Sequence, residues 1–173
     1  SSNQSFFINI IPNLNYVALN GGAGTGKTLL AIELMRNMAP KYKILFLCFN
    51  KPLARYIRYS FKGFNEKLYI HNIHQWVSTM KRGLDHPKTN SLDLDQEIET
   101  VVSEVKNDDK KYDVIIIDEA QDFSDEWMIS IEQMLRKNGK FYVFYDQQQS
   151  IFERKSQYFL KEKFSHLELE ENF

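Results

Sequence analysis

Eight residues near the N-terminus, Gly21 to Thr28 (GGAGTGKT), constrain the fold more than any other segment of the chain. A glycine, four residues of any type, Gly-Lys and then a hydroxyl residue is the pattern of a phosphate-binding loop. Such a loop needs a strand before it and a helix after it, and residues 16–19 and 28–38 have those patterns. A dinucleotide-binding fingerprint is excluded, because Lys27 stands where its last glycine would be.

The residue types in this loop suit the binding of ATP with Mg²⁺. Glycines let backbone N–H groups turn toward phosphates, and the N-terminus of the following helix adds a partial positive charge. We expect Lys27 to reach the β and γ phosphates and the Thr28 hydroxyl to ligate Mg²⁺. The alternative is a glycine-rich turn without a ligand. The predicted ATP-binding residues are Gly21, Gly22, Ala23, Gly24, Thr25, Gly26, Lys27 and Thr28.

Short runs of branched and aromatic residues alternate with helical patterns, which predicts a doubly wound α/β fold. The run from Val114 to Ile117 is apolar at every position, as in a central parallel strand covered on both faces. We therefore expect three layers, a mostly parallel sheet with helices on both faces, in a single domain over residues 1–173. The expected strands are residues 16–19, 44–49, 68–70, 114–117, 141–145 and 167–169.

Three further helices are expected from apolar spacing and capping residues. One begins after Pro52 and runs to about Phe61, and one covers residues 93–105. The third begins at Ser124, and Asn138 and Gly139 are expected to end it. Its apolar side would be Trp127, Met128, Ile131, Met134 and Leu135. Residues 81–111, which begin with the most polar stretch of the chain, are expected to form a small loop and helical insertion.

Two acidic residues follow the strand predicted at 114–117. A carboxylate at the end of a buried strand beside the loop is where a second Mg²⁺ contact is needed, and we assign it to Asp118. Glu119 is placed to orient and deprotonate the attacking water. The strand at 141–145 ends in Asp146 and three glutamines, one of which is expected to sense the γ phosphate, although a surface loop explains these residues equally well.

Composition limits the choice of partners and location. Basic and acidic residues number 22 and 23, so the charge of the whole chain gives no support to nucleic-acid binding. The single cysteine, Cys48, lies in an apolar run and is expected to be buried. No apolar stretch is long enough for a membrane span and no signal peptide is recognisable, so we expect a cytoplasmic protein without a membrane partner. The first and last residues suggest an expressed fragment.

Three motifs taken together resemble superfamily 1 helicases of the UvrD/Rep branch. They are the loop at Gly21 to Thr28, the pentapeptide DEAQD at Asp118 to Asp122, and D-x-x-Q at Asp146 to Gln149. The pentapeptide discriminates, because other ATPases with this loop continue differently after the acidic pair. The resemblance implies a RecA-like motor domain with Gln149 at the γ phosphate. It also implies a second RecA-like domain in the full-length protein, with catalytic arginines beyond the end of this chain.

Other positions are similar to further motifs of that family. Gln4 matches its adenine-reading glutamine, and Phe49 with Asn50 matches a motif that touches single-stranded DNA. His74 and Trp76 stand where the family has a T-x-H-x-F element. The resemblance thus implies nucleic-acid contacts by Phe49, Asn50, His74 and Trp76.

The helix expected after Pro52 would carry Arg55, Arg58 and Lys62 on one face, with aromatic residues between them. Cations for phosphates and aromatic rings for bases suit single-strand binding, but an amphipathic surface helix has the same pattern.

The function expected is that of an ATP-hydrolysing motor moving on single-stranded DNA, with RNA left open. The chain alone should bind nucleotide and turn it over poorly. One alternative is a stand-alone ATPase switch or sensor acting on a protein partner. A phosphotransferase would need a lid with arginines, and the DEAQD pentapeptide argues against it.

Overall fold

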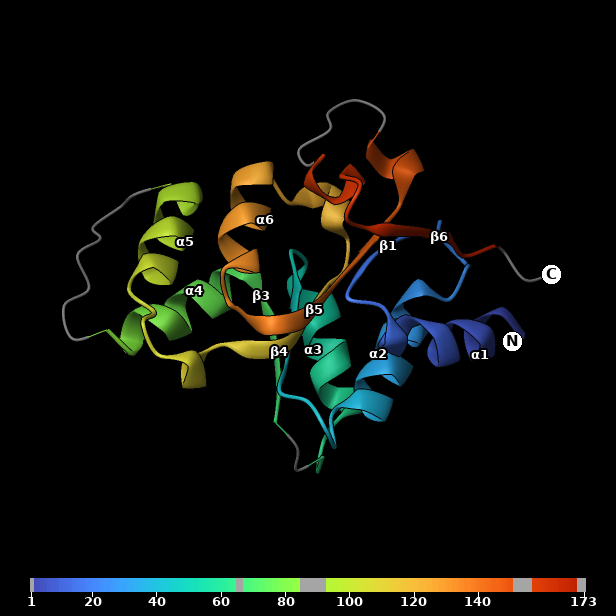
Figure 1. Cartoon of the computed structure of the whole chain (residues 1–173), viewed down its shortest axis with the longest axis horizontal. Coiled ribbons are helices and arrows are strands. Elements are labelled where there is room, and N and C mark those ends of the chain that lie inside the picture. The colour runs from blue at the N-terminus through green and yellow to red at the C-terminus, as the bar shows by residue number, and fades with distance from the viewer. Residues whose placement is uncertain (1, 65–66, 85–92, 151–156, 171–173) are drawn as a thin grey trace.

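The structure is a computed structural model that describes residues 2–64, 67–84, 93–150 and 157–170. Helices and strands alternate along these segments, as expected for a doubly wound fold (Figure 1). The helices are α1 (Ser2–Ile10), α2 (Lys27–Met38), α3 (Lys51–Ser60), α4 (Ile73–Arg82), α5 (Leu94–Ser103) and α6 (Asp125–Glu132). The strands are β1 (Tyr16–Asn20), β2 (Ile44–Cys48), β3 (Leu68–Asn72), β4 (Tyr112–Ile117), β5 (Leu135–Tyr145) and β6 (Ser165–Glu168).

These strands form one sheet in the order β3-β2-β4-β5-β1-β6, and every neighbouring pair is parallel. Strand β5 therefore lies between β1, which leads into the glycine-rich loop, and β4, which leads into the acidic pair. Because parallel strands end at the same edge of a sheet, the segments that follow β1, β4 and β5 meet there. The sequence placed β4 beside the loop, whereas the structure places β5 between them.

Both faces of the sheet are buried, which confirms the expected three layers. Helices α1, α2 and α3 cover one face, and α4, α5 and α6 cover the other (Figure 1). Neighbouring residues of β2 point into different layers: Phe46 packs with the first set of helices, and Leu45 and Leu47 pack with the second. All five residues of β2 are buried, as an interior parallel strand requires.

The predicted helix starts are confirmed at two serine and aspartate caps. The Ser124 hydroxyl accepts a hydrogen bond from Trp127 N at 3.2 Å, and the Asp93 carboxylate accepts one from Gln96 N at 2.9 Å. Helix α5 buries Ile98 with its neighbours against the sheet, so this helical part of residues 81–111 contributes to the core. The polar stretch expected at 85–91 lies outside the described residues.

The predicted end of the helix after Ser124 is wrong. Helix α6 ends at Glu132, and β5 begins at Leu135. The Met134 carbonyl accepts a hydrogen bond from Tyr112 N at 2.9 Å, so pairing with β4 competes with helix continuation. Asn138 has a left-handed φ of 63° and, with Gly139, lies within β5 where the pairing register with β4 shifts. The turn residues therefore form a bulge in a strand.

No helix among the described residues is long and apolar enough to cross a membrane.

Candidate functional site

The loop between β1 and α2 is held open by backbone geometry and by its own hydrogen bonds. Gly21 N donates to Tyr145 O at 2.9 Å, which ties the start of the loop to the end of β5. The Thr25 hydroxyl donates to Gly22 O at 2.7 Å. Gly24 and Gly26 have φ values of 82° and 84°, in the left-handed region that glycine occupies without strain. The loop thus keeps its backbone N–H groups available for phosphate oxygens.

Gln4, on α1, lies against this loop as the sequence predicted. Its side-chain Nε2 donates to Gly26 O at 3.3 Å. A Cβ atom added at Gly26 would lie 2.1 Å from that Nε2, so only glycine fits between the left-handed backbone and the glutamine. The N-terminal helix is therefore in direct contact with the residue that precedes α2.

Asp118 and Thr28 face each other across the edge of the sheet. The Thr28 hydroxyl donates to Asp118 Oδ2 at 3.4 Å, and Glu119 N donates to Asp118 Oδ1 at 2.8 Å. Asp118 is fully buried, and this burial raises the pKa of its carboxyl to about 6, although the nearby Lys27 ammonium opposes the rise. A buried hydroxyl and carboxylate are hard oxygen donors, which Mg²⁺ prefers.

These two oxygen donors fit Mg²⁺ bound together with phosphate. Within the described segments, no group of three or more His, Cys, Asp or Glu side chains could hold a metal ion. Mg²⁺ does not need such a group, because it usually takes one or two protein ligands and keeps substrate phosphates and waters.

Lys27 and Glu119 form an ion pair beside this oxygen pair. The Lys27 ammonium lies 3.5 Å from Glu119 Oε1, and the two side chains are 7% and 24% exposed. Glu119 has a left-handed φ of 54°, an uncommon conformation for a residue with a side chain. This strained turn directs the carboxylate back toward the loop, as backbone strain often does at functional sites.

Gln121 connects the segments that follow β4 and β5, a role that the sequence reasoning missed. Its Nε2 donates to Glu119 Oε2 at 2.6 Å and to Gln149 Oε1 at 3.3 Å. Its Oε1 accepts from Asp146 N at 3.0 Å. The side chain is 5% exposed, so both ends of its amide are committed inside the protein. The available signal was its place in the DEAQD pentapeptide.

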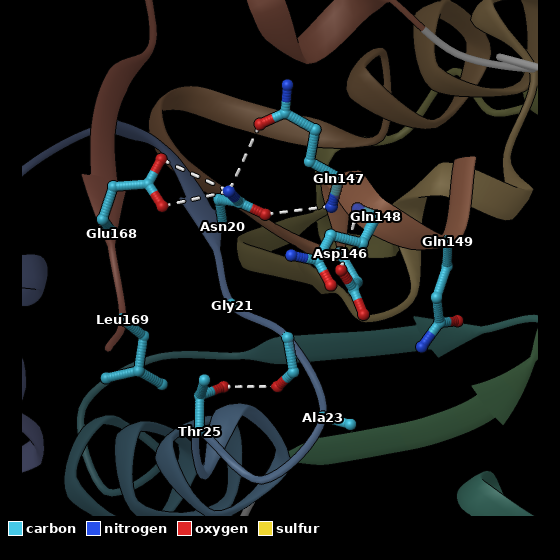
Figure 2. A pocket seen from close by; sticks show the side chains of 11 residues that line it. Asn20, Gly21, Ala23, Thr25, Asp146, Gln147, Gln148, Gln149, Glu168 and Leu169 are labelled. Carbon is cyan, nitrogen blue, oxygen red and sulfur yellow. Dashed lines mark hydrogen bonds between the residues drawn. The ribbon is translucent and has the colours of Figure 1, made fainter. Parts of the chain in front are cut away.

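A pocket of about 780 Å³ opens between the loop and the ends of β5 and β6. Figure 2 shows the Asn20 side chain between Glu168 and Gln147. Asn20 Nδ2 donates to Glu168 Oε2 at 3.0 Å, and its Oδ1 accepts from Gln147 N at 3.0 Å. Gln149 also lines this pocket, which places the predicted γ-phosphate sensor beside the glycine-rich loop.

Two of the predicted nucleic-acid residues lie together at the same sheet edge, nearer β3. The Phe49 ring is 39% exposed, and its centroid lies 5.7 Å from that of His74. The Trp127 indole stacks on Phe49 at 6.1 Å with an angle of 12° between the planes. Asn50 caps α3, because its Oδ1 accepts from Leu53 N at 3.0 Å. Trp127 is a surface aromatic residue that the sequence reasoning had assigned only to a helix core.

The position of Trp76 contradicts the prediction that it contacts nucleic acid. Its side chain is 1% exposed and packs in the apolar layer under α4 and α5. Burial of the large apolar indole stabilises the core and leaves no ring face for a base. Gln75, which stands where the resemblance predicted a small residue, completes the cap of α4 with Asn72.

The basic helix α3 is confirmed, but its side chains do not act as one face. Arg55 is exposed, whereas Arg58 is partly buried and donates to Ile70 O at 3.2 Å and Gln75 Oε1 at 2.9 Å. Phe61 is buried, and its ring packs in the apolar layer under α2.

Solved structures share this arrangement of strands and helices. The Pif1 helicase of Candida albicans has a TM-score of 0.62 at 15% identity, over 100% of this chain and 40% of that chain. AMPPCP-bound DnaA of Aquifex aeolicus has a TM-score of 0.50 at 16% identity, over 98% and 45%. Domain III of Thermotoga maritima DnaA has 0.51 at 14%, over 98% and 60%. These similarities show a RecA-like α/β fold.

The chain spans less than two thirds of each of these relatives. A comparison with curated protein sequences gave no match. A family model described as Schlafen group 3, DNA/RNA helicase domain, matches residues 15–172. Because this match covers nearly the whole chain, the protein belongs to the Schlafen group 3 DNA/RNA helicase domain family.

Proposed function

We propose that this chain is an ATP-hydrolysing motor domain that couples hydrolysis to movement along, or unwinding of, single-stranded DNA. The observation that carries the proposal is the meeting of three segments at one sheet edge. Gln121 bonds to Glu119 and Gln149, and Glu119 in turn pairs with Lys27 of the glycine-rich loop. A loop without a ligand would not require a buried lysine, an acidic pair and a glutamine to converge.

In this proposal the loop from Gly21 to Thr28 binds ATP, and Gln4 contacts the nucleotide beside Gly26. Thr28 and Asp118 would hold Mg²⁺, which when bound neutralises phosphate charge. Lys27 would exchange its contact with Glu119 for phosphate oxygens. Glu119, released from the ammonium, would accept a proton from the attacking water.

Gln149 is proposed to contact the γ phosphate, and Gln121 holds both Gln149 and Glu119. The amide of Gln121 cannot titrate, so it orients the general base without competing for its proton. A change at the γ phosphate would thus reach the turn after β4 and the turn after β5 together.

The finer assignment to the UvrD/Rep branch rests on the DEAQD pentapeptide at Asp118 to Asp122. We also propose a single RecA-like domain over residues 1–173, with a small insertion at about 81–111, and a second RecA-like domain elsewhere in the full-length protein. Coverage of only 40% of the Pif1 chain supports the second domain. The cytoplasmic location remains a prediction from the sequence.

The test measures binding of a fluorescent ATP analogue with Mg²⁺ and then the ATPase rate with and without oligothymidylate. We expect binding that is lost in Lys27→Ala, and we expect a slow rate for the chain alone that rises with DNA in the full-length protein. Lys81→Ala, which removes a lysine paired with Glu97 at 2.8 Å away from the loop, is the matched control. A full-length rate that ignores DNA would instead favour the ATPase switch.

A further inference from the structure

A second pocket, of about 420 Å³, lies at the open edge of the sheet beside β3. It lies between α3 and α4, which cover opposite faces of the sheet. Its ionisable lining residues are all cations or histidines: Lys51, Arg58, His71, His74 and Arg82. No carboxylate of the described residues lines it. In a chain with a net charge of −1, such a one-sided lining is a strong local concentration of positive charge.

These cations lack compensating acids. Among the described residues, Lys51, Arg58 and Arg82 form no ion pair, whereas Lys27, Arg36, Lys81, Arg136 and Lys163 each do. Burial lowers the pKa of His71, and the charges of Arg58 and Arg82 lower it further. The histidine thus reports a positive electrostatic potential inside the pocket. An anion entering it would gain from all of these groups.

Arg58 has the geometry of a residue held in place for a ligand. Its Nη1 donates to both Ile70 O and Gln75 Oε1, while its guanidinium has five N–H donors in total. Anchoring through one nitrogen reduces the conformational entropy that binding would otherwise cost. The remaining donors can meet phosphate oxygens, for which the planar guanidinium is suited.

The pocket adjoins the aromatic surface made by Phe49, His74 and Trp127, because His74 belongs to both. Single-strand binding sites combine a positively charged groove for the backbone with aromatic rings for the bases. The two features occur here side by side at one end of the sheet, with β2 and β4 between β3 and the strand β5 that leads to Gln149.

We infer that the pocket between α3 and α4 binds phosphodiester groups of a single strand whose bases lie against Phe49. The inference rests on the proposed function, since it extends the nucleic-acid path of the motor to the outer edge of the sheet. Phosphate is common to DNA and RNA, so the pocket itself accepts either.

The test compares two double variants that remove equal charge. Lys51→Gln with Arg82→Gln changes exposed cations of the pocket, and Arg55→Gln with Lys62→Gln changes exposed cations of the α3 region outside it. Fluorescence anisotropy measures binding of labelled oligothymidylate and oligouridylate of equal length over a range of salt concentrations. Melting temperatures of both variants confirm that the exposed substitutions leave the fold intact.

We expect the pocket variant to bind about tenfold more weakly, and its salt dependence to fall by about 0.7 per lost phosphate contact. The control variant should stay within about twofold of the wild type. A loss on either oligonucleotide supports the pocket and identifies the strand it accepts. Equal effects of the two variants would overturn the pocket while leaving the motor function intact. If the wild type binds neither strand, the proposed function fails as well.

Discussion

Gln121 donates a hydrogen bond of 2.6 Å from its Nε2 to the Glu119 carboxylate, two residues before it in the same turn. The same amide contacts Gln149 and Asp146, which follow the neighbouring strand β5. Glu119 is thus held between a neutral amide and the Lys27 ammonium. The orientation of the proposed general base depends on a residue that contacts neither the phosphate loop nor the metal ligands.

Gln121→Ala should therefore lower the ATPase rate with little effect on nucleotide affinity. Hydrogen bonds to charged groups contribute about 1.5 to 3 kcal/mol, so we expect the turnover number to fall by about tenfold to a hundredfold. Steady-state kinetics on the full-length protein, together with binding of a fluorescent ATP analogue, separate the two effects.

Gln133→Ala is the matched control for that variant, because Gln133 is exposed at the end of α6. It should leave both quantities unchanged. A Gln121→Ala protein that loses affinity and keeps its turnover number would show that the amide supports the binding site and not the base.

Asp118→Asn should stabilise the folded chain at neutral pH. Burial raises the pKa of Asp118 from 3.8 to about 6, so the folded state binds a proton that the unfolded state has already lost. Ionisation of the buried carboxyl therefore costs stability above pH 6, and this cost disappears as the pH falls from about 6 to about 4. At 1.4 kcal/mol per unit of pKa, the penalty is on the order of 2 to 3 kcal/mol.

Chemical denaturation in EDTA at pH 7.5 and at pH 4 measures this difference. The stabilisation by Asp118→Asn should be present at the higher pH and absent at the lower one, and Mg²⁺-dependent binding of ATP should be lost. Asp109→Asn, at an exposed position before β4, should show neither change. Destabilisation by Asp118→Asn at pH 7.5 would contradict the direction of this pKa shift.

The layers of the fold could be predicted from the sequence because the pattern of buried strands is local. Val114 to Ile117 is apolar throughout, and the glycine-rich loop requires a strand before it and a helix after it. The end of α6 could not be predicted, because Met134 and Leu135 suit a buried helix face as well as a strand. Pairing of Tyr112 with Leu135 decides between the two, and such pairing is not local.

The candidate site divides in the same way. Residues with a motif around them, such as Lys27 and Asp118, were placed correctly at the sheet edge, because the ends of parallel strands meet there. Gln121 was missed because its contacts come from β5, whose place between β1 and β4 is set by the order of the strands. Trp76 and Trp127 were exchanged in role, since the exposure of an aromatic residue depends on which helix covers it.

The two tryptophans provide a direct test of the nucleic-acid face. Trp127 stacks on the exposed Phe49, while Trp76 is buried in the core. Oligothymidylate should therefore quench the intrinsic fluorescence of the wild type and of Trp76→Phe. Trp127→Phe should remove the quenching even where anisotropy still detects binding. Quenching that disappears only with Trp76→Phe would restore the sequence-based assignment of Trp76 and remove Trp127 from the face.

Gly24 and Gly26 allow the contact between α1 and the phosphate loop to be measured. Both have left-handed φ values near 83°, so alanine at either position carries backbone strain on the order of 1 to 3 kcal/mol. A Cβ at Gly24 meets no other atom within 4 Å, whereas a Cβ at Gly26 meets Gln4 Nε2 at 2.1 Å. Gly26→Ala should therefore lose more stability and more ATP affinity than Gly24→Ala.

Addition of Gln4→Ala to each variant separates strain from contact. It should recover part of the stability of Gly26→Ala, because the colliding amide is removed, and it should recover none in Gly24→Ala. Thermal denaturation and titration with the fluorescent ATP analogue provide both measurements. If Gln4→Ala has the same effect in the two glycine variants, α1 does not press on the loop, and the proposed contact of Gln4 with the nucleotide loses its structural support.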